Sequence, residues 1–250
     1  AFDCSHIGTN TVTLTVTDNN GNTSICTSTV TVEDNVDPVA ICQDINLYLD
    51  ASGAATISGT DIDNGSTDAC GIANVVASTT DFTCANVGTN AVTLTVTDNN
   101  SNTANCSSTV TVIDTISPVV ICQNISIALD VTTGLASIVA GDIDNGSTDA
   151  CGIASLVASQ TAFDCSHVGT NSVTLTVTDN NGNTSTCTSI VTVTETTAPV
   201  AVCQDITVQL DGTGNITIVA SDIDNGSSDN CGIASLVASQ TAFDCSHIGT

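Results

Sequence analysis

The chain has 250 residues, with 26 acidic side chains, no lysine or arginine, and a formal net charge of −26. This charge excludes nucleic acid and anionic membrane surfaces as partners, because both are bound through Lys and Arg. Aromatic residues make up only 2% of a chain that is 41% hydrophobic, so the core must consist mainly of Val, Ile, Leu and Ala. No apolar run is long enough to span a bilayer.

The sequence repeats with a period of about 80 residues. The segment AFDCSHIGT at 1–9 recurs unchanged at 242–250. A period of this length predicts an array of small domains rather than one globular fold. We number the sequence repeats 1 to 4 and expect their bounds at 1–36, 37–116, 117–197 and 198–250. Repeats 1 and 4 are partial, so we expect the chain to be a window on a longer polymer.

Repeat 2 shows the predicted elements in chain order. Apolar and polar residues alternate over 45–49 and again over 92–97, which indicates strands with one buried face. Further strands are predicted at 55–57, 72–77, 79–84 and 106–112. Turns or polar loops are predicted between them, at 50–53, 61–68, 87–90 and 98–102.

This pattern gives about seven short antiparallel strands in each complete repeat and no amphipathic helix. It predicts an all-β tandem array of immunoglobulin-like sandwiches, each of about 80 residues. The linkers at 34–38, 114–118 and 195–199 are short, and each contains or ends in proline. Domains joined in series by such links are expected to form a rod.

The cysteines recur at four places in each repeat, and no C-x-x-C pair is present. An even set in a small domain indicates disulfides in an oxidising, extracellular setting rather than a cytosolic metal site. Four cysteines allow three pairings, and predicted strand positions favour one of them. The expected pairs are Cys42–Cys106, Cys70–Cys84, Cys122–Cys187, Cys151–Cys165 and Cys231–Cys245. Cys4, Cys26 and Cys203 then lack partners, through truncation or through a bond between subunits.

Acidic residues gather in segments that the sandwich topology brings to one pole of each domain. The linker, the loop after the second strand and the last hairpin turn all contribute carboxylates there. The first junction would hold Asp34, Asp37, Asp61, Asp63, Asp68 and Asp98. The second would hold Asp114, Asp142, Asp144, Asp149 and Asp179, and the third Glu195, Asp222, Asp224 and Asp229.

Crowded carboxylates without any Lys or Arg need a counter-charge. Ca²⁺ suits irregular sets of oxygen ligands, so the sequence predicts calcium sites at the junctions. The alternative is that D-N-G-S is a plain solvated turn.

Several motifs recur in register: C-Q-D-I, D-N-G-S-x-D-x-C-G, F-D-C-S-x-x-G and V-T-L-T-V-T-D-N-N-G-N-T-S-x-C-T-S. They resemble the immunoglobulin-like hyalin repeats found in tandem in large secreted surface proteins of Bacteroidota. The resemblance covers the whole chain and implies surface display, adhesion or fibre formation. The total absence of basic residues departs from typical hyalin repeats.

The sequence therefore predicts an extracellular structural protein, secreted or attached to the cell surface: a disulfide-stapled, calcium-stiffened fibre or adhesin stalk. Its expected partners are other copies of itself or cell-surface and glycan ligands. No enzyme is expected, because no activated nucleophile is evident and the histidine at 6, 167 and 247 is replaced by Asn86 in repeat 2. The alternative function is a module whose repeats themselves bind glycans.

Overall fold

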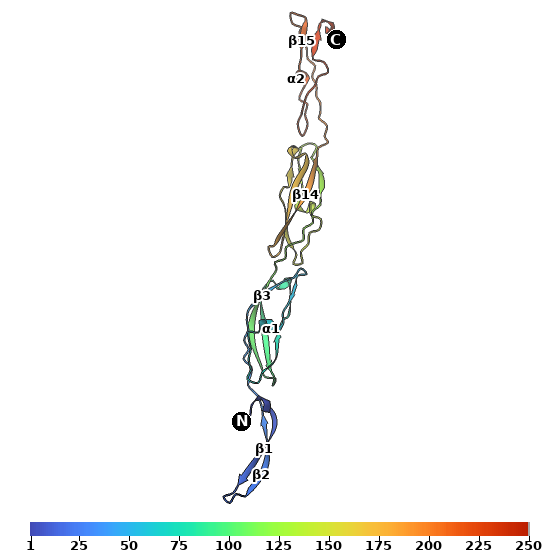
Figure 1. Cartoon of the computed structure of the whole chain (residues 1–250). Helices are drawn as coiled ribbons and strands as arrows, with labels where there is room; N and C mark the ends of the chain where they lie inside the picture. The colour runs from blue at the N-terminus through green and yellow to red at the C-terminus, as the bar shows by residue number, and fades with distance from the viewer. Residues whose placement is uncertain (250) are drawn as a thin grey trace. The chain divides into compact units, whose positions relative to one another are not determined.

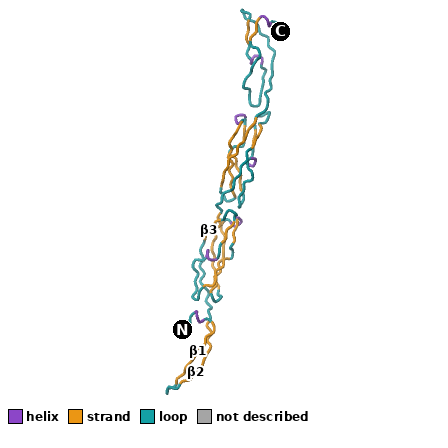
Figure 2. Tube along the Cα trace, turned by 45° about the vertical axis from the view of Figure 1, so that its right-hand side comes forward, coloured by secondary structure: helices purple, strands orange, loops and turns teal. Residues whose placement is uncertain are grey.

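The computed structural model describes residues 1–249 and consists of β-strands, loops and a few helices of a single turn. The chain divides into two compact units, which are drawn in Figure 1. The first comprises Ala1–Ser117 together with Asp149–Gly152. The second comprises Pro118–Thr148 and the described residues from Ile153 onward. Figure 2 shows that loops and turns account for much of each unit.

The first unit begins with a hairpin and continues with a complete sandwich. The 3-10 turn η1 (Cys4–His6) precedes the antiparallel hairpin of β1 (Gly8–Thr17) and β2 (Thr23–Val32). The sandwich then follows in the order β3 (Ile45–Tyr48), β4 (Ala54–Thr56), α1 (Gly59–Ile62), β5 (Ile72–Ala77), β6 (Asp81–Thr83), η2 (Cys84–Asn86), β7 (Gly88–Asp98) and β8 (Thr103–Ile113).

Two sheets form this sandwich. The larger has the strand order β3-β8-β7-β5, and the smaller pairs β4 with β6. Isolated bridges join Val39 to Thr67 and Cys42 to Asp63. The all-β, immunoglobulin-like sandwich predicted from the sequence is thus confirmed, with six strands in repeat 2 where about seven were expected.

The first two strands of the sandwich do not form a hairpin with each other. β3 pairs with β8, and this pairing is parallel, whereas β4 pairs with β6 in the other sheet. The turn at Asp50–Gly53 therefore carries the chain from one sheet to the other. Leu49 and Ile57, which flank this crossing, both pack into the same core. β3 and β4 both turn their apolar side chains towards this core, as the alternation predicted, but they belong to different sheets.

The core depends on the long strand β7. Val92, Leu94 and Val96 are at most 1% exposed, and the threonines between them lie on the opposite face. Phe82 of β6 is 1% exposed in the same cluster. Burying a side chain of this size contributes about 1.5–3 kcal/mol. One phenylalanine therefore supplies an appreciable part of the stability of a domain that is poor in aromatic residues.

Strand β7 also begins earlier than expected, because Gly88–Asn90 are paired rather than forming a turn. The side-chain amide of Asn90 donates to the carbonyl oxygens of Asn86 and Gly88, at 2.7 and 3.1 Å. It thereby holds the chain where η2 enters the strand. On β8, the buried Ser108 hydroxyl donates to the Gln43 carbonyl at 2.6 Å and fixes the segment before β3.

The second unit repeats this sandwich. Its larger sheet has the order β11-β13-β14-β9, with β9 parallel to β14, and β10 pairs with β12. Its elements are β9 (Ile125–Ala128), β10 (Ala136–Ser137), η3 (Ala140–Asp142), β11 (Ile153–Ala158), β12 (Ala162–Phe163), η4 (Cys165–His167), β13 (Gly169–Asp179) and β14 (Thr184–Thr194).

Repeat 4 follows in this unit. It contributes β15 (Asn215–Thr217), α2 (Ala220–Ile223), β16 (Ala242–Asp244) and η5 (Cys245–His247), with β15 paired to β16. Across the described residues, none of the helices has the length and apolar character that a membrane crossing would require.

Candidate functional site: disulfides and carboxylates where repeats join

Five disulfides form among the described cysteines. In two of them, both cysteines belong to the same repeat. Cys42 bonds Cys106 across 64 residues, and Cys122 bonds Cys187 across 65. Both are the pairs expected from the sequence. Each ties the segment before the first strand to the last strand of its own sandwich. The hydroxyls of Ser108 and Ser189 reinforce the same connection by bonding the carbonyls of Gln43 and Gln123.

The other three disulfides join successive repeats, and here the expected pairing was wrong. Cys70–Cys84, Cys151–Cys165 and Cys231–Cys245 do not form. The bonds are Cys4–Cys70, Cys84–Cys151 and Cys165–Cys231. Cys4, which was expected to lack a partner, is therefore paired. Cys26, Cys203 and Cys245 are exposed free thiols in the described chain.

Strand β7 explains why Cys70 and Cys84 do not meet. Cys84 lies in η2, just before β7 begins at Gly88. Cys70 lies beyond its other end, where its carbonyl accepts a hydrogen bond from the Asn99 side chain at 2.8 Å. A strand of this length extends roughly 30 Å. The two cysteines therefore lie at opposite ends of one sandwich, far outside the range that a disulfide can bridge.

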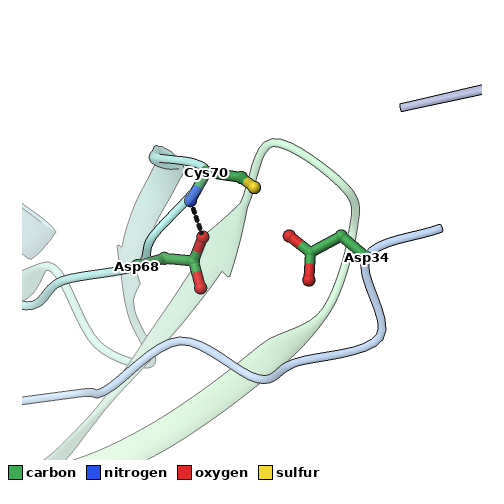
Figure 3. A group of neighbouring side chains, drawn as sticks. All are labelled: Asp34, Asp68 and Cys70. Atoms are coloured by element: carbon green, nitrogen blue, oxygen red, sulfur yellow. Dashed lines mark hydrogen bonds between the residues drawn. The ribbon is translucent and has the colours of Figure 1, made fainter. Parts of the chain in front are cut away.

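Two carboxylates lie beside the inter-repeat disulfide at the first junction. Asp34 comes from the linker and Asp68 from the loop before β5. One carboxylate oxygen from each of them and the Cys70 sulfur lie within 4.8 Å of one another. In Figure 3 the Asp34 carboxylate faces the other two side chains, and Asp68 accepts a hydrogen bond from the Cys70 backbone N–H at 2.7 Å.

The second junction repeats this arrangement. Asp114, Asp149 and Cys151 form the equivalent group within 4.8 Å, and Asp149 accepts from the Cys151 N–H at 2.7 Å. All three residues belong to the first unit. Asp114 is only 7% exposed.

The tip of the β7–β8 hairpin completes the first junction. Asn99 donates its backbone N–H to the Gly71 carbonyl at 3.0 Å, and the Asn102 amide donates to the Asp34 carbonyl at 3.2 Å. The linker, the loop and the hairpin turn therefore converge, as the topology predicted. They converge through amide and backbone contacts, whereas the hairpin carboxylate of Asp98 is directed elsewhere.

Asp98 binds its own turn. It is 1% exposed and accepts hydrogen bonds from the N–H groups of Asn100 and Asn102, both at 2.8 Å, and from the Asn102 amide at 2.7 Å. Burial raises the pKa of this carboxyl, but the hydrogen bonds from Asn102 and the backbone outweigh it and leave the pKa below its ordinary value. Asp179 accepts the equivalent hydrogen bonds in repeat 3, from Asn181 and Asn183.

The D-x-D-N-G-S carboxylates are also engaged locally. Asp63 accepts from the N–H and hydroxyl of Ser66, and Asp61 accepts from the N–H and hydroxyl of Ser58 at 2.6 and 2.8 Å. The Ser66 hydroxyl lowers the pKa of Asp63, and the Ser58 backbone N–H lowers that of Asp61. These contacts are of the kind expected for the plain turn that the sequence left open as the alternative to a calcium loop.

The equivalent carboxylates of later repeats behave in the same way. Asp144 and Asp224 accept backbone N–H bonds from Ser147 and Ser227, both at 3.1 Å. Asp142 and Asp222 accept the N–H bonds of Val139 and Val219, at 2.7 and 2.8 Å. Asp37 is exposed. Of the expected metal ligands within the described part of the chain, the structure therefore groups only the linker and loop carboxylates of the first two junctions, in pairs.

The third junction differs because the linker carries glutamate. The Glu195 carboxylate accepts the Thr197 backbone N–H, and Asp229 accepts the Cys231 N–H at 2.8 Å. Among residues 1–249, Glu195, Asp229 and Cys231 do not form a group comparable to the other two.

The donor atoms at the first junction fit a hard cation in part. The Cys70 sulfur is held in a disulfide, so it is no thiolate ligand. Two carboxylates remain, and the Asp34 Oδ2 and Asn100 Oδ1 atoms are buried without a hydrogen-bond partner among the described residues. Oxygen ligands of this kind suit Ca²⁺. The set is smaller than the crowd of carboxylates expected from the sequence.

Comparison with known proteins finds a match to one family model over part of the chain, together with distant structural likenesses. Residues 113–193 match the family model of the HYR domain. Curated protein sequences yield no match. Protocadherin gamma B7 extracellular cadherin domains 1–4 share 13% identity at a TM-score of 0.34, with 86% of this chain and 66% of that chain covered. A three-immunoglobulin-domain segment of titin shares 10% identity at a TM-score of 0.41, with coverage of 74% and 75%.

A third similar structure is protocadherin gamma C5 EC1–3, at 10% identity and a TM-score of 0.37, covering 76% of this chain and 78% of that chain. Identities this low concern the fold alone, and such TM-scores mark a distant likeness. No partner or activity of those proteins is therefore transferred to this chain. The family match supports a hyalin-repeat-type domain at residues 113–193.

Proposed function

We propose that this chain is part of an extracellular, non-catalytic array whose repeats are clamped to their neighbours by disulfides and which serves as a fibre or an adhesin stalk. The observation that carries the proposal is the bond between Cys84 of repeat 2 and Cys151 of repeat 3, with Cys4–Cys70 and Cys165–Cys231 at the adjoining junctions. Five disulfides in a chain of this size fit an oxidising, extracellular environment.

The inter-repeat disulfides give each junction two covalent connections. One is the short linker, such as 114–118, and the other is the disulfide beside it. Load applied along the chain would be shared between them, and the disulfide limits how far two successive sandwiches can separate. A hyalin-repeat-type domain at residues 113–193 is consistent with this adhesive, structural role.

Calcium at the junctions is the second part of the proposal. The Asp34–Asp68 and Asp114–Asp149 pairs would supply the carboxylate ligands, and the Asn100 side-chain oxygen is a further candidate donor. The chain offers no Lys or Arg to neutralise these charges. A bound cation would lower the repulsion between the two carboxylates of a pair and thereby draw linker and loop together. The proposed calcium ligands are fewer than those expected from the sequence.

Peptide mapping without reduction tests the clamp. Digestion of the whole chain should release a peptide containing Cys84 linked to one containing Cys151. Recovery of Cys84 linked to Cys70 instead would overturn the proposed clamp. A digest at acidic pH, after alkylation of free thiols, prevents exchange during the measurement.

Small-angle scattering and calorimetry test the calcium sites. The whole chain should bind Ca²⁺ and be more extended in calcium than in excess chelator. The Asp34→Asn/Asp114→Asn variant should lose most of this response, whereas Asp205→Asn, which removes an exposed carboxylate elsewhere, should keep it. Identical scattering curves in calcium and chelator, with no binding heat, would refute stiffening by calcium. Binding of the isolated chain to a glycan array would instead favour a glycan-binding module.

A further inference from the structure

We infer that the carboxylate pairs protect two of the three inter-repeat disulfides from anionic thiols, and that Cys165–Cys231 is the inter-repeat bond that such thiols open first. The inference rests on the inter-repeat pairing of the proposed function, but not on calcium or on fibre assembly. It assigns different chemical reactivity to three bonds that occupy equivalent places in the repeats.

The first step is the position of the charges. At Cys4–Cys70 the sulfur of Cys70 lies within 4.8 Å of carboxylate oxygens of both Asp34 and Asp68. At Cys84–Cys151 the sulfur of Cys151 has the same relation to Asp114 and Asp149. Two negative charges therefore stand next to one sulfur of each bond, and the chain has no Lys or Arg to offset them.

The second step is that solvent access does not single out Cys165–Cys231 as the most reactive bond. Cys70, Cys84, Cys151, Cys165 and Cys231 are all half-buried. The cysteines of the two disulfides within repeats are half-buried as well. Among the cysteines that form disulfides, only Cys4 is exposed, and it belongs to a bond that the carboxylates are inferred to protect. Differences in reactivity between these bonds should therefore follow local charge more than exposure.

The third step is the natural variation at the third junction. Cys231 belongs to no carboxylate pair of this kind among the described residues. Its linker carries Glu195, whose carboxylate bonds the Thr197 N–H, in place of Asp34 or Asp114. Asp229 accepts the Cys231 N–H at 2.8 Å, as Asp68 and Asp149 do for Cys70 and Cys151, so this bond keeps one such carboxylate and lacks the pair that the other two have.

The Cys165 sulfur lies 3.5 Å from the carbonyl oxygen of Asn230 and 3.8 Å from that of Gly134. The sulfurs of Cys4 and Cys84 have similar carbonyl neighbours, at 3.6 and 3.7 Å, so the bonds differ in their carboxylates and not in these contacts.

The chemistry is two successive thiol–disulfide exchanges. A small thiolate attacks one sulfur, forms a mixed disulfide with it, and releases the other cysteine as a thiolate. A second thiolate then attacks the mixed disulfide, which yields the oxidised small-molecule disulfide and the second cysteine thiolate. Two small thiols thus supply the two electrons that reduce one protein disulfide.

The carboxylates oppose this reaction at either sulfur. An anionic thiol that attacks Cys70 is repelled by Asp34 and Asp68. If it attacks Cys4 instead, Cys70 must leave as a thiolate beside the same two negative charges, and their repulsion disfavours its departure. Coulomb repulsion at such separations near a surface corresponds to roughly a tenfold slower reaction at low ionic strength.

The test compares thiols of different charge on the whole chain, in chelator and at low salt. Mercaptoethanesulfonate is anionic and cysteamine is cationic, and alkylation followed by mass spectrometry gives the opening rate of each disulfide. For each disulfide, the rate with mercaptoethanesulfonate is divided by the rate with cysteamine, and this ratio cancels differences in solvent access between the disulfides. We expect this ratio to be about tenfold lower at Cys4–Cys70 and Cys84–Cys151 than at Cys165–Cys231, with the difference largely lost at 1 M salt.

Matched variants localise the effect. Asp34→Asn should raise the ratio at Cys4–Cys70 and leave Cys84–Cys151 unchanged, and Asp114→Asn should do the reverse. In the unmodified chain the Asp34 side chain accepts a hydrogen bond from the Val36 N–H at 3.1 Å. Asn also has a side-chain oxygen that can accept this bond, so the linker turn should be preserved. Asp205→Asn is the control for net charge.

Equal ratios at all three inter-repeat bonds, or a difference that salt does not reduce, would overturn the inference while leaving the clamp intact. The salt dependence of the unmodified chain decides this even if a variant fails to fold. Failure of the pairing itself would appear earlier, in the peptide map.

Discussion

Cys84 and Cys151 are joined by a disulfide across 67 residues, although one belongs to repeat 2 and the other to repeat 3. Repeat 3 therefore uses two of its cysteines for an internal bond and shares the other two, one with each neighbour. The internal bonds stabilise individual sandwiches, and the shared ones connect them. The two kinds should have separable effects.

The internal disulfide of repeat 2 should stabilise that repeat alone. Removing it in Cys42→Ala/Cys106→Ala should lower the free energy of unfolding by about 4 kcal/mol, from the entropy of a closed loop of this size. Tyr48, the chain's one tyrosine, lies in β3, and there is no tryptophan, so tyrosine fluorescence during denaturation reports this sandwich. The matched Cys122→Ala/Cys187→Ala variant should leave the Tyr48 transition in place. An equal shift in both would contradict local action.

Phe82 should be the most costly single truncation in repeat 2. It is 1% exposed in a core that otherwise consists of aliphatic side chains, and Phe82→Ala should destabilise the sandwich by about 3–5 kcal/mol. Val76→Ala is the control, because Val76 is 49% exposed and should change stability by about 0.5 kcal/mol or less. Denaturant titration measures both, and a cost for Phe82→Ala as small as that of the control would show that this core is wrongly assigned.

The Ser108 hydroxyl should contribute through one hydrogen bond. Ser108→Ala leaves the Gln43 carbonyl without this donor and should cost about 1 kcal/mol. Ser107, the preceding residue on β8, is exposed, so Ser107→Ala removes an exposed hydroxyl where Ser108→Ala removes a buried one. Tyrosine fluorescence during denaturation again gives the comparison. Equal midpoints for the two variants would remove Ser108 from the stabilising contacts.

Asp98 should make the sandwich sensitive to acid. Its hydrogen bonds hold its pKa below the ordinary value despite burial, so its ionised form stabilises the folded state. That contribution is complete above the unfolded pKa of about 3.9 and is lost as the pH falls through the lower pKa of the folded state. Asp98→Asn should therefore be less stable than the unmodified chain at pH 7, and the difference should narrow towards pH 2.

The comparison with Asp205→Asn isolates this effect of Asp98. Lowering the pH also reduces the self-repulsion of a chain with a net charge of −26, and this change is common to all variants. A gap between Asp98→Asn and the unmodified chain that stays constant from pH 7 to pH 2 would rule out a role for Asp98 ionisation.

Much of the fold follows from the local pattern. The alternation of Val92, Leu94 and Val96 with threonine fixes both the strand and its buried face, because side chains of a strand point to opposite sides in turn. The same pattern does not reveal which strand lies beside it. The parallel pairing of β3 with β8 and the crossing at Asp50–Gly53 depend on how two sheets close over one core.

The junction was harder to predict, since it depends on the ends of strands. Cys70 and Cys84 were the cysteines left over once strand positions had paired Cys42 with Cys106, but β7 separates them. The expected gathering of the loop at 61–68 and the hairpin turn at 98–102 at one pole of the domain was the signal that could have placed Cys70 beyond the far end of this strand. For the carboxylates, Asp63 is used by Ser66 within its own turn, whereas Asp34 and Asp68 meet only after the linker and loop have folded.

The second connection at each junction also changes what a protease can achieve. The bond between Cys84 and Cys151 encloses the linker at 114–118, and Cys4–Cys70 and Cys165–Cys231 enclose the linkers at 34–38 and 195–199. A single cut in any of these segments leaves both fragments attached through sulfur. The chain is severed there only when a peptide bond and a disulfide are broken together, so a chain cut once at a linker remains one covalently connected molecule.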